Sequence, residues 1–100
     1  MITRNTVIGT ILATTTVNFN MAQIFPNEYA KKTAAAFEIS NPTDAALSVR
    51  IDTFNAQPTR IDPHTTRYIS RPVTNLIIEN LDAAIDVAAN ELNVSLEFDI

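Results

Sequence analysis

Residues 92–100 read Leu-Asn-Val-Ser-Leu-Glu-Phe-Asp-Ile, and apolar and polar residues alternate through the whole stretch. Successive side chains of a β-strand point to opposite faces of a sheet, so this alternation predicts a strand with one buried and one solvated face. Val94, Leu96 and Phe98 are expected to point into the core. A chain that ends on such a strand builds at least part of its core from a sheet.

The same alternation predicts further strands upstream. In residues 73–80, Leu76, Ile77 and Ile78 are apolar on both faces of the strand, which indicates a central position in a sheet. Going towards the N-terminus, the other segments predicted as extended are the stretch around Tyr68 and Ile69, residues 60–63, 47–54 and 33–40, and 14–21.

Turn residues separate these segments. Asn41-Pro42-Thr43-Asp44 combines a proline that presets φ with polar side chains that bond back to the local backbone. We expect this turn to join residues 33–40 and 47–54 as a β-hairpin. A second turn is expected at Asn55–Pro58, and Pro26–Lys32 is expected to form a loop.

Two segments leave alternatives open. Residues 7–21 are consistent with one long bent strand or with two strands bent near Gly9. Asp82–Glu91 is consistent with a helix capped by Asp82, since Leu81, Ile85, Ala88 and Leu92 fall at helical spacing. The alternative is a strand with Ile85 and Val87 facing inward and a turn at Asn90. The neighbouring strands favour the second interpretation.

Seven or eight short strands with turns about every ten residues predict an all-β fold, a small antiparallel β-sandwich or jelly-roll-like barrel. A chain of 100 residues is expected to be a single β-sandwich domain over residues 1–100. The predicted core consists of Phe19, Phe37, Leu47, Val49, Ile51, Leu76 or Ile77, Val94, Leu96 and Phe98.

The residues that carry chemistry are few. The chain has no Cys, one His and one Gly, which argues against thiol catalysis, thiolate metal sites and glycine-rich phosphate loops. His64 is predicted to be a solvated turn residue with no nucleophile motif around it. Asp82 and Asp86 do not follow a calcium-loop pattern. We therefore predict no catalytic, cofactor-binding or metal-binding residues, no cofactor and no enzymatic activity.

Charge limits the classes of partner. Charged residues make up 18% of the chain, the formal net charge is −4, and Lys31 and Lys32 are the only lysines. Nucleic-acid binding requires a cationic surface, which this composition does not supply. No run approaches the ~18 apolar residues of a membrane span. Tyr29 and Tyr68 are the only aromatic candidates for a binding platform, and Arg67 and Arg71 flank Tyr68 as a small basic spot or as surface charge pairs.

Three segments resemble a known class of proteins. Residues 37–51 (Phe-Glu-Ile-Ser-Asn-Pro-Thr-Asp-Ala-Ala-Leu-Ser-Val-Arg-Ile) read as strand, Asn-rich turn and strand, and residues 61–69 and 73–80 follow as further strands. This order is similar to that of small β-sandwich accessory proteins of bacteriophage particles, the decoration or cement proteins. It covers about residues 33–80, and the scarcity of glycine departs from many such sequences. The resemblance implies a non-enzymatic structural role in the virion and assigns no site residues.

Association with other chains is expected on the same basis. The edge strands of a sandwich need protection, both lysines lie outside the predicted strands, and the chain ends on the apolar Ile100. We expect a homo-oligomer, for which the resemblance implies a trimer, or contacts with a major capsid protein. The alternative is a module that binds carbohydrate or a cell surface, such as part of a phage fibre. A small hydrolase would require a nucleophile beside His64.

Overall fold

The computed structural model describes residues 2–7, 9–20, 33–53, 55–89 and 91–98. Eight strands lie in this part of the chain, and no helix does. In chain order they are β1 (Ile2–Val7), β2 (Thr16–Asn20), β3 (Ala36–Asn41), β4 (Leu47–Ile51), β5 (Thr59–Ile61), β6 (Thr65–Ile69), β7 (Asn75–Asn80) and β8 (Asn93–Phe98). None of the described segments forms a helix long and apolar enough to cross a membrane.

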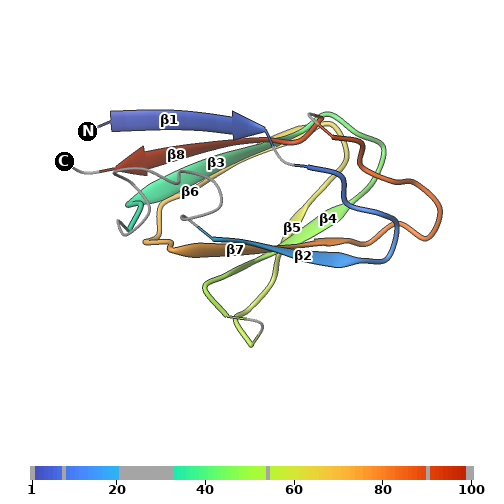
Figure 1. The fold of residues 1–100 in the computed structure, drawn as a ribbon, viewed down its shortest axis with the longest axis horizontal. Coiled ribbons are helices and arrows are strands. Elements are labelled where there is room, and N and C mark those ends of the chain that lie inside the picture. The colour runs from blue at the N-terminus through green and yellow to red at the C-terminus, as the bar shows by residue number, and fades with distance from the viewer. Residues whose placement is uncertain (1, 8, 21–32, 54, 90, 99–100) are drawn as a thin grey trace.

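The strands form two antiparallel four-stranded sheets that pack face to face (Figure 1). One sheet has the order β1-β8-β3-β6 and the other has the order β2-β7-β4-β5. The first strand of the chain pairs with the last, the second with the seventh, the third with the sixth and the fourth with the fifth. A long antiparallel ribbon wrapped across two sheets gives this order, which is the jelly-roll arrangement.

The wrapping places alternate connections at opposite ends of the sandwich. The β1–β2, β3–β4, β5–β6 and β7–β8 connections lie together at the end opposite to the start of β1 and the finish of β8 (Figure 1). We call this the distal end. Its described residues are 9–15, 42–46, 62–64, 81–89 and 91–92.

The core lies between the sheets, as the alternation predicted. Seven of the predicted core residues are almost fully buried: Phe37, Leu47, Val49, Leu76, Val94, Leu96 and Phe98. Phe19 and Ile51 are partly buried and pack against this cluster. They lie near the ends of β2 and β4, where fewer side chains cover them. The central position predicted for the strand in residues 73–80 is confirmed, because β7 is paired with β2 on one side and β4 on the other.

The predicted hairpin at Asn41–Asp44 is wrong. β3 pairs with β6 and β8, whereas β4 pairs with β5 and β7, so the turn carries the chain from one sheet to the other. The Asn41 amide explains the crossing, since it donates to the carbonyl of Ala45 at 2.8 Å and to that of Asp62 at 3.3 Å. These bonds tie the turn to the β5–β6 connection. The turn at residues 55–58 does join a hairpin, because β4 and β5 pair.

The two open alternatives are settled. Residues 2–20 form two strands, but the interruption extends over residues 9–15 rather than a bend at Gly9. Residues 82–89 form neither a helix nor a full strand. Val87 points inward and makes a single antiparallel bridge with Ile11, while Ile85 is exposed, contrary to the prediction. Asn90, Ile100, Tyr29 and Phe54 lie outside the described residues.

Replacing Phe98 with alanine should destabilise the protein by about 3–5 kcal/mol, because the ring is fully buried between the sheets and its removal leaves a cavity. Denaturant unfolding followed by circular dichroism measures the change. Tyr68→Ala is a matched control, since Tyr68 is 52% exposed on β6. Equal losses in both variants would contradict the assigned core.

Candidate functional site

His64 lies in the tight turn between β5 and β6 and adopts a positive φ of 56°. Its backbone N–H donates to the Thr43 carbonyl, and its Nε2 atom is hydrogen-bonded to the Asp44 carboxylate. Both side chains are exposed. In the described part of the chain, the hydrogen-bond partner of the His64 ring is the Asp44 carboxylate, whereas a catalytic triad also places a hydroxyl against the ring. The contact joins two distal connections.

The two carboxylates considered for calcium hold the distal backbone instead. Asp82 Oδ1 accepts hydrogen bonds from the N–H groups of Ala84 and Ile85, each at 2.8 Å. These bonds favour the charged form and lower the pKa of Asp82. Asp86 Oδ1 accepts from the Ala13 N–H at 2.7 Å. No group of three potential metal-ligating side chains occurs among the residues that the structure describes.

Tyr68 and Arg67 bond to groups on opposite sides of β6. The Tyr68 hydroxyl donates to Glu97 Oε2 at 2.8 Å, over the outer face of the β1-β8-β3-β6 sheet. This bond to a carboxylate raises the pKa of Tyr68, because the protonated phenol is the donor. Arg67 reaches the other way, towards β5. Arg71 is exposed beyond the end of β6.

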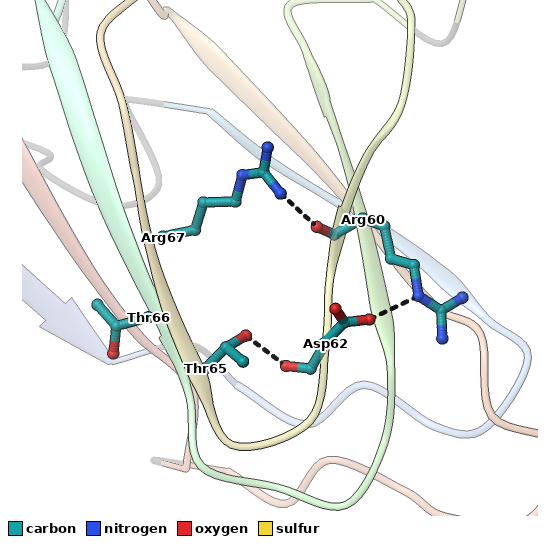
Figure 2. A pocket seen from close by; sticks show the side chains of 5 residues that line it. All are labelled: Arg60, Asp62, Thr65, Thr66 and Arg67. Carbon is teal, nitrogen blue, oxygen red and sulfur yellow. Dashed lines mark hydrogen bonds and ion pairs between the residues drawn. The ribbon is translucent and has the colours of Figure 1, made fainter.

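A polar depression of about 300 Å³ lies between β5 and β6, the edge strands of the two sheets (Figure 2). The Arg67 side chain extends across the depression, and its Nη1 group donates to the Arg60 carbonyl at 3.4 Å. Across the strand, Arg60 Nε forms an ion pair with Asp62 at 2.7 Å. Thr65 donates to the Asp62 carbonyl at 2.6 Å, whereas the Thr66 hydroxyl turns away to Ser40. The depression therefore offers an arginine, a paired carboxylate and a hydroxyl on an exposed side of the sandwich.

The distal connections are fastened by two buried asparagines that occupy corresponding positions. Asn80 ends β7, and its amide nitrogen donates to the carbonyls of Ile85 at 2.8 Å and Ile11 at 3.2 Å, while its oxygen accepts from the Asp82 N–H. Asn41 ends β3 and makes the same three hydrogen bonds. Its amide nitrogen donates to the carbonyl of Ala45, on its own connection, and to that of Asp62, on another, and its oxygen accepts from the Thr43 N–H. Each asparagine joins two distal connections.

We found no match to the chain among protein families, curated proteins or solved structures.

Sequence reasoning named neither the depression nor the asparagines. Arg60, Asp62 and Thr65 are joined by contacts within one short turn, and Arg67 joins them because β5 and β6, from different sheets, meet at one side of the sandwich. The asparagines did carry a signal. Each is a polar residue at the inward position of its strand, after Phe37 and Ile39 in one case and Leu76 and Ile78 in the other. A polar side chain at an inward position needs buried hydrogen-bond partners.

Asn80→Ala should destabilise the fold by about 1–3 kcal/mol, because the Ile85 carbonyl and the Asp82 N–H lose their partner and the Ile11 carbonyl keeps only its bond from Val87. Denaturant unfolding measures the loss, and amide hydrogen exchange at Ile11 and Val87 should accelerate. Asn93→Ala is the matched control, since Asn93 is an exposed asparagine in β8. A loss no larger than that of the control would refute the role assigned to Asn80.

Proposed function

We propose that this protein is a non-enzymatic structural subunit of a virus particle. In this proposal it is a capsid decoration (cement) or minor virion protein of a bacteriophage that acts through protein–protein contacts. The observation that carries the proposal is the jelly-roll strand order, an architecture used by viral capsid proteins. The same architecture serves lectins and other proteins, so the fold alone does not determine function. The surface supplies the second line of support.

The outer face of β8, β3 and β6 is polar with few charges. Ser40 and Thr66 share a hydrogen bond of 3.0 Å across β3 and β6, and Asn93 on β8 continues this row. Glu38 and Glu97 are the charged residues on this face of the three strands. Hydroxyl and amide groups lose less on desolvation than charges do, and they pair readily with another polar surface. Such a face suits a subunit that is permanently packed against neighbouring subunits.

The described ionisable groups support a structural role. Asp82 and Asp86 accept backbone N–H groups, and Asp44 is bonded to His64. Each of these contacts fastens one distal segment to another or closes a turn. The expected partners are further copies of this chain, a trimer by the resemblance, and a major capsid protein, and the expected location is the virion.

The protein should co-sediment with intact particles at a fixed ratio to the major capsid protein. Particles purified on a density gradient and analysed by quantitative mass spectrometry measure that ratio. An unrelated host protein of similar size provides the background level. Recovery only in the particle-free fractions would refute the proposal.

The depression between β5 and β6 favours a second function, binding of carbohydrate. Sugar hydroxyls are bound by side chains that both donate and accept hydrogen bonds, and Arg67, Asp62 and Thr65 provide both kinds of group. An acidic sugar would also pair with the Arg67 guanidinium, which is bonded only to a neutral carbonyl in the described structure.

If this second function is correct, neutral and acidic oligosaccharides should shift the backbone NMR signals of Arg60, Asp62 and Thr65. Arg67→Ala should then weaken binding about tenfold, because a charge-assisted hydrogen bond is lost. Arg71→Ala is the control, since Arg71 lies at the other end of β6 and outside the depression. Shifts spread over other surfaces, or none at millimolar sugar, would exclude this site.

A further inference from the structure

The distal end exposes an unusual number of apolar side chains. Leu12 is 54% exposed, Leu81 is 41% exposed and Ile85 is 38% exposed. Between and after the last two, Ala83, Ala84, Ala88 and Ala89 are exposed as well. Single exposed apolar residues are normal, but a contiguous set of them marks an interaction surface. We call Leu12 and residues 81–89 the apolar distal surface.

This surface is held in place. The Ile11 and Val87 backbones exchange two hydrogen bonds of 2.9 Å, and the Thr14 N–H donates to the Asp82 carbonyl. Asp86 and Asn80 add the side-chain bonds described above. The segment that contains Leu12 and the segment 81–89 are therefore hydrogen-bonded to each other. A surface that is ordered before binding loses less conformational entropy on association.

The charges around the apolar distal surface have one sign. The distal end carries five carboxylates, those of Asp44, Asp62, Asp82, Asp86 and Glu91. Asp62 is paired with Arg60 of β5, and Asp44 is bonded to His64. The described residues of this end include no Lys or Arg. An incoming surface therefore meets apolar side chains at the centre and negative charge at the border.

The negative charge at the distal end limits which kind of surface can bind there. Two copies of the chain that met through this end would bring like carboxylates together, which costs free energy in a symmetric contact. An anionic lipid surface would be repelled for the same reason. A protein surface with an apolar hollow bordered by Lys or Arg matches both the centre and the border.

We propose that the apolar distal surface docks onto a different protein, at a site that is apolar in its centre and bordered by basic side chains. The inference rests on the proposed function in one respect, namely that this protein is another subunit of the same particle. The Leu12 and Ile85 side chains enter the apolar hollow, and Glu91 faces its basic border.

Site-specific photo-crosslinking in the native host tests the proposal with the full chain. A photoreactive phenylalanine analogue replaces Leu12 in one variant and Tyr68, on the outer face of the β1-β8-β3-β6 sheet, in the other. Mass spectrometry identifies each crosslinked protein. Ile85→Ser and Glu91→Lys are then added to the Leu12 variant. Glu38→Lys is the matched control, because it makes the same charge reversal on the outer face of β3.

The Leu12 position is expected to crosslink to one protein other than this chain. Ile85→Ser and Glu91→Lys should each lower the yield roughly tenfold, and Glu38→Lys should leave it unchanged. The two-dimensional NMR spectrum of each variant checks that the fold is retained. If the partner shows this pattern but belongs to no particle, the docking proposal stands and the proposed function fails.

Other outcomes overturn the docking proposal. If this protein is bound to particles and crosslinks from Tyr68 but not from Leu12, the proposed function stands, but the apolar distal surface is not the docking site. Crosslinks from Leu12 to a second copy of the chain or to lipid would show a different occupant. A yield that does not respond to Glu91→Lys, or no crosslink from either position, would also refute it.

Discussion

The jelly-roll wrapping depends on satisfying the backbone groups that each crossing between the sheets leaves without a strand partner. At the distal end the chain leaves β3 for β4 and β7 for β8, and both crossings start from a buried asparagine. One amide side chain bonds two carbonyls from different connections and one N–H, so each asparagine replaces part of a missing sheet ladder. Without these bonds, the Ile85 carbonyl would be unpaired at a cost of about 1–3 kcal/mol, and the carbonyls of Ile11, Ala45 and Asp62 would each keep one other donor. The repeated use of one residue type at equivalent places indicates that this constraint shapes the whole end of the molecule.

Alternation predicted the strands and most of the core, because it depends only on which side chains share a face. Phe37, Val94, Leu96 and Phe98 could be placed inside from the pattern alone, and they are fully buried. Pairing is a different question. β3 and β4 each have a buried and a more solvated face, so their pattern fits a hairpin as well as it fits strands in opposite sheets. The inward position of Asn41 distinguishes the hairpin from the crossing between sheets, because its amide donates to the Asp62 carbonyl on the β5–β6 connection.

The candidate sites were less accessible to sequence reasoning for a related reason. Arg60 and Arg67 are seven residues apart and lie on edge strands of different sheets, yet Arg67 bonds the Arg60 carbonyl. No spacing rule predicts a depression that forms where two sheets meet. His64 was expected in a turn and lies in one, but its partner Asp44 comes from a connection twenty residues away. Local sequence predicted the type of environment, and tertiary wrapping supplied the partners.

Residues 81–89 show how a conflict between patterns can indicate a contact surface. Leu81, Ile85 and Ala88 suggested a helix, and Ile85 with Val87 suggested a strand, yet only Val87 is buried. Its bridge to Ile11, the Asp82 and Asp86 carboxylates and the Asn80 amide account for the backbone conformation. Nothing in the fold requires Leu81, Ile85 or the four exposed alanines to be apolar. Sites where local rules fail without a structural reason are often functional or strained, and the composition of this segment therefore supports the proposal that a partner covers it.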